Sequence, residues 1–281
     1  MTLKNILALT SLVAFTFGCE DIKDSERFIP VETPEVPETP TDPDDPAVSK
    51  QLKNVLIEDF TGMLCINCPD AATVVTQLQD YYGHDRVIAV AIHGDMPGLS
   101  GPLKNDLGTE YFRYWGVQSL PTGMVDRKGG LQNHPSWMAI TDERLKMESP
   151  VNLSLENSTY DAAERALTVQ VDALAGAGLK ANLQVWITES NIVSFQKMPD
   201  NSVNARYVHN HVLRGAVNGS WGETIALEPG VENSVTYHYA VPSAWVAENL
   251  SIVAFVYDSS SNEVIQVIEQ SLFEEEETES L

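Results

Sequence analysis

Two of the chain's three cysteines lie together as Cys65-Ile66-Asn67-Cys68, and this pair is the part of the sequence best suited to covalent chemistry. The apolar segment 55–60 leads into the pair, and residues with helical spacing follow it. A cysteine at the start of a helix is favoured as a thiolate, because the helix dipole and free N–H groups stabilise negative charge there. The pair therefore predicts thiol–disulfide exchange, in which Cys65 attacks as a thiolate and Cys68 resolves the mixed disulfide.

Two metal-binding interpretations compete with this chemistry. A CxxC pair also serves zinc sites, but the remaining cysteine, Cys19, lies near the start of the chain and offers no further thiol here. His209 and His211 are separated by one residue, so on a strand both imidazoles would share one face and could bind a metal. No carboxylate or third histidine is obviously placed beside them, and a polar strand face or an interdomain contact is the simpler interpretation. We expect no metal and no cofactor.

The elements that must position the CxxC pair are predicted to alternate between strands and helices. Segments 54–60 and 86–93 are mostly apolar, as in strands covered on both faces. Between them, Pro69 suits a first helical turn, and apolar residues recur at helical spacing up to Tyr82. This unit predicts two parallel strands joined by a right-handed crossover. Two shorter helices are expected over 109–115 and 135–147, the second with Trp137, Ile140, Leu145 and Met147 facing inward.

The order of parts resembles the thioredoxin superfamily: a strand, a CxxC pair at a helix start, a second strand, and Leu120-Pro121-Thr122 before a hairpin and a final helix. This resemblance implies an α/β domain with a mixed central sheet flanked by helices, and a cis Pro121 packed against the disulfide. A cis bond before proline costs only about 0.5–1 kcal/mol. The resemblance also assigns Asp59 the role of a buried acid that helps to deprotonate Cys68.

Parts of this pattern leave alternatives open. Asp59 could instead be a solvated strand end, with Glu58 facing inward. The aromatic residue usual before the first cysteine is Leu64 here, and the usual Gly-Pro between the cysteines is Ile66-Asn67. Because those inner residues help to set the redox potential, the sequence does not predict whether the pair reduces or oxidises.

The second half of the chain has the alternation of β-strands. Apolar and polar residues alternate in several segments separated by Asn, Gly, Asp and Ser turns, and no long helix is indicated. The pattern predicts an all-β domain over 150–273, an antiparallel sandwich of immunoglobulin or fibronectin type, after an α/β domain over 50–149. The strand candidates are 151–155, 167–171, 183–188, 234–241, 250–257 and 263–271.

The ends of the chain predict export and anchoring. Residues 1–18 have the charge and apolar run of a signal peptide, and Cys19 follows Thr16-Phe17-Gly18 as the lipidated cysteine of a bacterial lipoprotein would. An ordinary signal peptide with an incidental cysteine is the alternative. Residues 19–49 are acidic and proline-rich and predict an extended, disordered stalk. Residues 274–281 form an acidic tail.

The net charge of the chain and the order of its segments limit its possible partners and its location. Forty acidic against 17 basic residues leave a net charge of −23, which argues against nucleic acid as a partner. The whole layout resembles a family of outer-membrane lipoproteins from Bacteroidota named for a twenty-eight-kilodalton antigen. This resemblance implies an outer-membrane location, facing the periplasm or the cell surface, through a lipid anchor at Cys19. Outside the cytosol, the Cys65–Cys68 pair is expected to be oxidised at rest.

Two functions fit these features. The first is a thiol–disulfide oxidoreductase that acts on extracytoplasmic protein thiols and disulfides, with Cys65, Cys68, Pro121 and Asp59 as its site. The second is a binding or adhesion lipoprotein that meets an unknown surface protein and keeps the CxxC as a structural disulfide.

Overall fold

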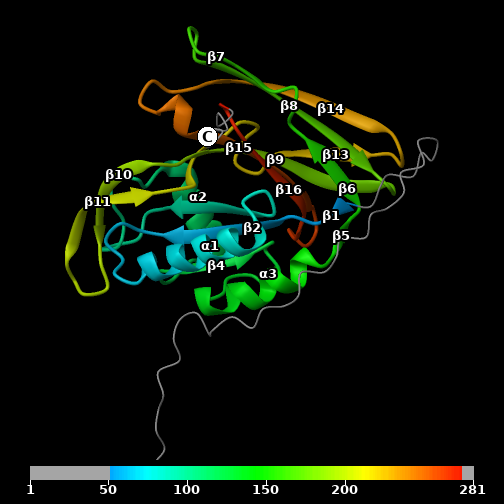
Figure 1. Ribbon diagram of the computed structural model, residues 1–281. Helices are drawn as coiled ribbons and strands as arrows, with labels where there is room; N and C mark the ends of the chain where they lie inside the picture. Colours follow the sequence, from blue (N-terminus) through cyan, green and yellow to red (C-terminus); the bar gives the residue numbers. More distant parts are fainter. Residues whose placement is uncertain (1–50, 274–281) are drawn as a thin grey trace, which may run out of the picture. The chain divides into compact units, whose positions relative to one another are not determined.

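The first strand–helix–strand unit forms as its hydrophobic pattern predicts. In the computed structural model, which describes residues 51–273, β2 (Val55–Thr61) leads through the CxxC into α1 (Cys68–Tyr82), and β3 (Val87–His93) follows (Figure 1). β2 and β3 pair in parallel, from Val55 opposite Val87 to Thr61 opposite His93. Both strands are buried almost throughout, which explains why their sequences are apolar rather than alternating.

Successive residues of β2 enter two different cores. Val55 and Ile57 pack under α1 and α3 (Trp137–Leu145) together with Trp137. Leu56 and Phe60 point to the opposite face, where they join aromatic residues such as Trp186 from the second half of the chain. Because side chains alternate between faces along a strand, adjacent residues of β2 contact different parts of the molecule.

The remaining helices agree with the predictions in position and differ at their ends. α2 (Asp106–Trp115) begins three residues before the predicted start, because the Asn105 side chain accepts a hydrogen bond from the Gly108 N–H and caps the helix there. α3 follows a short 3₁₀ turn, η2 (His134–Ser136), and ends at Leu145. Met147 therefore lies beyond α3 and is 43% exposed, so the prediction that it faces inward was wrong.

β-Strands make up most of the rest of the chain. β4 (Thr122–Val125) pairs antiparallel with β2, and the short strands β1 (Gln51–Leu52) and β5 (Glu148–Ser149) pair with each other. The second half contains β6 (Val151–Ser154), β7 (Thr159–Asp161), β8 (Ala166–Ala175), β9 (Leu179–Glu189), β10 (Ile192–Lys197), β11 (Val203–His209), β12 (Val212–Ala216), β13 (Glu223–Leu227), β14 (Glu232–Ala240), β15 (Leu250–Asp258) and β16 (Val264–Ser271). A 3₁₀ turn, η3 (Ala247–Asn249), precedes β15.

One sheet runs through both halves of the described chain. β12 pairs in parallel with β3 at Val212 and Ala91, and antiparallel with β9 on its other side. The eight-stranded sheet therefore has the order β16-β15-β9-β12-β3-β2-β4, with β13 also paired to β9. The sequence predicts separate domains over 50–149 and 150–273, whereas the structure joins these segments. β12 covers an edge of β3 that would otherwise expose unpaired N–H and C=O groups.

A smaller sheet packs against the second half of the large one. Its order is β14-β8-β6, with β7 also on β8, and Figure 1 shows β8 and β14 across the top of the view. The alternating apolar residues of β8, including Val169 and Val171, meet Val185 and Ile187 of β9 in a shared core. The fold as described is thus mostly β-sheet with few helices, and one of its two packed sheets continues into the N-terminal half.

The predicted signal peptide (1–18), Cys19, the stalk (19–49) and the acidic tail (274–281) lie outside the described residues. Within 51–273, no helix is both long and apolar enough to cross a membrane.

Candidate functional site

The CxxC pair forms the disulfide that was expected of it. Cys65 and Cys68 are bonded, with their Cα atoms 5.4 Å apart. Cys68 is the first residue of α1, and Cys65 lies in the tight loop between β2 and that helix, where its N–H donates to the Gly62 carbonyl at 3.1 Å. The disulfide therefore lies at the N-terminal end of α1 and just past the C-terminal end of β2.

The loop before the disulfide passes close to the Leu-Pro-Thr segment. A Cβ atom on Gly62 would lie 2.3 Å from the Leu99 carbonyl oxygen and 3.1 Å from Leu120 Cδ1, so only glycine fits there. The Leu120–Pro121 peptide bond is cis, as the resemblance implied, and Thr122 pairs with Phe60 of β2. Pro121 is thereby placed beside the end of β2, next to the loop that carries Cys65.

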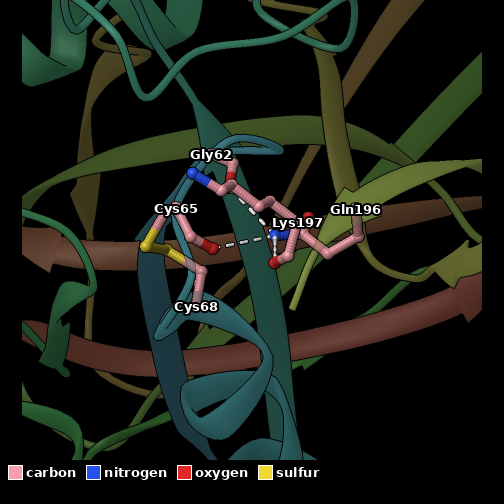
Figure 2. The surroundings of a disulfide bond; sticks show 5 residues. All are labelled: Gly62, Cys65, Cys68, Gln196 and Lys197. Atoms are coloured by element: carbon pink, nitrogen blue, oxygen red, sulfur yellow. Dashed lines mark hydrogen bonds between the residues drawn. A yellow bond between two sulfur atoms is a disulfide. The ribbon is translucent and has the colours of Figure 1, made fainter. Parts of the chain in front are cut away.

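A hairpin from the second half of the chain covers the disulfide loop. β10 and β11 form this hairpin, and Gln196 of β10 reaches from it into the loop (Figure 2). Gln196 Nε2 donates to the carbonyl oxygens of Cys65 at 3.0 Å and Gly62 at 3.3 Å, and the Lys197 N–H donates to the Met63 carbonyl at 2.9 Å. Cys65 is 3% exposed and Cys68 is 2% exposed.

Asp59 and Glu58 are both buried, on opposite faces of β2. Glu58 is fully paired with Arg127, whose Nε lies 2.8 Å from Oε2 and whose Nη2 lies 3.0 Å from Oε1. Asp59 faces α1, is 5% exposed, and its Oδ1 atom has no hydrogen-bond partner among the described residues. Burial raises the pKa of Asp59 to about 7 from an ordinary 3.8. The alternative of a solvated strand end is therefore wrong.

Asp59 opens into a cavity of about 360 Å³ that also contacts Cys68. The cavity opens to solvent and lies between α1 and the C-terminal ends of β2 and β3, the usual location of ligands in sheets of this kind. Its far wall comes from β11 and the turn to β12. Its lining includes Asp59, Cys68, His93, Tyr207, His209 and His211, with further polar side chains from Thr61, Thr73, Thr76, Gln196 and Asn210; Pro121 does not line it.

The three histidines of this cavity are held in the neutral form. Burial lowers the pKa of His93 to about 3 and that of His211 to about 4, and it lowers the pKa of His209 as well. The Nδ1 atoms of His93 and His211 have no hydrogen-bond partner within 51–273. His209 ends β11, whereas His211 lies in the following turn with φ 56°, so the two do not share a strand face. Across the described residues, no three His, Cys, Asp or Glu side chains are placed to hold a metal ion.

Three residues of the site did not emerge from the sequence. His93 is a polar residue at the end of an otherwise apolar strand, and this position was a usable signal. Gln196 and Tyr207 carry no such signal, since they reach the disulfide and its cavity from more than a hundred residues away along the chain.

The comparisons with known proteins identify the family. The sequence matches the family described as "Outer membrane protein Omp28" over residues 108–276, which is more than half of the chain but begins after the CxxC. A structure of HBP35 of Porphyromonas gingivalis is similar in fold, with a TM-score of 0.62 and 20% identity over 82% of this chain and 79% of that one. A domain of the outer membrane lipoprotein Omp28 from the same organism is 33% identical, with a TM-score of 0.32, over 44% of this chain and 88% of that one.

No curated protein matches the sequence. The family match covers most of α2 and all later elements, including the β10–β11 hairpin that bonds to the loop carrying Cys65. The chain therefore belongs to the Omp28 family of outer membrane proteins, and its location is the outer membrane.

Proposed function

We propose that the protein is a thiol–disulfide oxidoreductase of the outer membrane, acting on extracytoplasmic protein thiols and disulfides. The observation that carries this proposal is Asp59, a buried carboxyl group without a partner among the described residues, in the wall of the cavity that also contacts Cys68. Burying a carboxyl group without a hydrogen bond destabilises a fold. A role in proton transfer to and from Cys68 explains why a buried carboxyl group without a partner is present at this position.

The chemistry divides between the two cysteines. In the reduced pair, Cys65 near the N-terminus of α1 is the thiolate that attacks a substrate disulfide. Cys68 then attacks the mixed disulfide, and Asp59 accepts the Cys68 proton as this thiol becomes a thiolate. The substrate leaves with reduced cysteines, and the Cys65–Cys68 disulfide is regenerated.

The arrangement of elements supports a thioredoxin-like site. Parallel β2 and β3 joined by α1, the cis Leu120–Pro121 bond, and β4 antiparallel to β2 are the parts that this resemblance requires. In this proposal Pro121 lies beside the pair and shapes the approach of the substrate. The continuation of the sheet through β12 goes beyond the resemblance, because it brings the β10–β11 hairpin against the loop that carries Cys65.

The burial of the pair favours a second candidate function, a binding lipoprotein whose CxxC is a structural disulfide. With Cys65 only 3% exposed, a protein substrate cannot reach its sulfur unless the segments around it move. The oxidoreductase therefore requires the site to open, and the structural-disulfide candidate requires it to stay closed.

A prediction on pH tests the oxidoreductase. Reduction of insulin disulfides by the reduced protein should become faster as pH rises through about 7, because Asp59 must lose its proton to act as a base. Asp59→Asn should lower the rate by about a hundredfold and remove this pH dependence. Asp70→Asn, at an exposed acid in the first turn of α1, is the matched control and should leave both unchanged.

Unfolding at different pH values provides an independent measurement. The folded-state pKa of Asp59 lies above its ordinary value, so the folded protein binds this proton more tightly than the unfolded chain. The contribution of Asp59 to stability is therefore lost as pH rises from about 4 to 7, and Asp59→Asn should remove this loss.

An unchanged pH profile of insulin reduction in Asp59→Asn would show that this carboxyl takes no part in exchange.

We also propose that a lipid on Cys19 anchors the protein in the outer membrane, with the acidic stalk (19–49) between anchor and fold. Cells grown with a radiolabelled fatty acid should label the protein, and Cys19→Ala should remove the label and release the protein into the soluble fraction. A labelled Cys19→Ala variant would place the lipid elsewhere.

A further inference from the structure

The two cysteines of the disulfide face different surroundings. The loop carrying Cys65 is bonded through its backbone to Gln196 and Lys197 of the β10–β11 hairpin, and Cys65 itself is 3% exposed. Cys68 lines the cavity between α1 and this hairpin, and Cys65 does not. A molecule small enough to enter the cavity therefore meets Cys68 and not Cys65.

The cavity has the properties of a small-molecule site. Its volume of about 360 Å³ lies within the range of such sites. Asp59 Oδ1, His93 Nδ1 and His211 Nδ1 are buried without hydrogen-bond partners within 51–273, and all three residues line it. Buried polar groups in folded proteins nearly always have a partner, so three such atoms in one cavity point to a ligand that supplies the missing bonds. The rest of the lining mixes alanine and valine with threonine and amide side chains, which suits a short carbon chain carrying polar groups.

We propose that this cavity binds low-molecular-weight thiols and disulfides, and that these exchange with Cys68. This inference rests on the proposed function, and it adds the class of molecule that exchanges electrons with the pair between encounters with protein substrates. The reacting molecule has a sulfur on a short carbon chain and at least one hydrogen-bonding group for Asp59, His93 or His211.

The exchange balances with two molecules of small thiol. The thiolate of the first attacks the Cys68 sulfur; a bond forms between these two sulfurs, the Cys65–Cys68 bond breaks, and Cys65 leaves as a thiolate near the N-terminus of α1. The thiolate of the second attacks the small-molecule sulfur of this mixed disulfide, and Cys68 leaves. The two small thiols are oxidised to one disulfide, and their two protons pass to Cys65 and Cys68, the latter by way of Asp59. The protein gains two electrons.

The test compares the two cysteines in the reduced full-length chain. Hydroxyethyl disulfide is added to Cys65→Ser, which keeps Cys68, and to Cys68→Ser, which keeps Cys65, and the adduct on each is followed by peptide mass mapping. We expect Cys68 to react at least about tenfold faster than Cys65, because only Cys68 contacts the cavity.

Filling the cavity provides the second arm. Ala72→Phe, on the cavity side of α1, combined with Cys65→Ser should slow the Cys68 adduct by about tenfold or more. Thr76→Phe, one turn later in the same wall, repeats the test should Ala72→Phe fail to fold. Gln77→Phe, an exposed position of α1 outside the cavity, is the matched control and should leave the rate unchanged.

The outcomes separate this inference from the proposed function. A faster reaction at Cys65 than at Cys68, or no effect of either filling variant, would overturn the cavity route. Single-turnover reduction of insulin by the pre-reduced protein involves no small thiol and measures the proposed function alone. The cavity variants with both cysteines intact should retain it. If the unaltered protein does not reduce insulin but its Cys68 adduct forms rapidly, the proposed function on protein substrates is overturned. The cavity then remains as a site for small thiols.

Discussion

Cys65→Ser should reduce the turnover of insulin disulfides to the rate of the uncatalysed reaction. A serine hydroxyl does not attack disulfides at neutral pH, and the variant loses the thiolate near the N-terminus of α1. Cys68→Ser should also stop turnover, but by a different route: its Cys65 can still attack, and without a resolving cysteine the substrate stays bound as a mixed disulfide. Turnover assays together with non-reducing gels distinguish the two variants.

Both serine variants should remain folded, so a loss of turnover can be attributed to the missing thiol and not to unfolding. The disulfide closes a loop of only a few residues, and its removal should cost about 2 kcal/mol by the chain-entropy argument. Urea denaturation of both serine variants is the control. Turnover that persists in a folded Cys65→Ser variant would rule out Cys65 as the attacking thiol. No turnover by the unaltered protein would favour the binding lipoprotein, whose CxxC is a structural disulfide.

Arg127→Met should lower the free energy of unfolding by about 3–5 kcal/mol, because it leaves the Glu58 carboxylate buried without its partner. Glu58 is 1% exposed and both its oxygens accept from Arg127. The guanidinium of Arg127 also lies 4.9 Å from the Tyr257 ring centroid and 5.1 Å from that of Phe255, both on β15. The pair thus links β2 to a strand from the other half of the chain.

The double variant Glu58→Met with Arg127→Met is the companion to this experiment. Replacing both charges with apolar groups leaves no unpaired ion, so much of the lost stability should return. Lys128→Met is the matched control, since Lys128 is the next residue and its pair with Glu263 is largely exposed; it should cost less than about 1 kcal/mol. Equal losses in Arg127→Met and Lys128→Met by urea denaturation would contradict the assignment of a buried, essential pair.

Local sequence patterns were sufficient to predict the strands and the helix near the disulfide. The apolar runs of β2 and β3, and the helical spacing after Pro69, are properties of a few neighbouring residues, and the predicted strands and helix are confirmed within one or two residues. The strand candidates of the second half are confirmed in position for the same reason, because alternation reports which face of a strand is buried.

The order of strands in the large sheet lay beyond such patterns. A strand's sequence shows that its edges need partners but does not name them, so nothing in 212–216 indicated that this segment would pair with β3, more than a hundred residues earlier. The same limit applies to the partners of the two buried acidic residues of β2. The pattern could not show that Glu58 meets Arg127 while Asp59 stays unpaired, since β2 is buried on both faces and each face receives its partners from elsewhere.

The sequence by itself determined the disulfide, the strand–helix junction that holds it, and the cis Leu120–Pro121 bond, since all of these depend on short motifs and on the backbone preferences of single residues. Only the tertiary structure decided that Gln196 bonds to the loop carrying Cys65 and that His93 and His211 line a cavity with Cys68. These contacts form when β12 completes the sheet next to β3, and their free energy comes from burial and hydrogen bonds between distant segments, which no local pattern records.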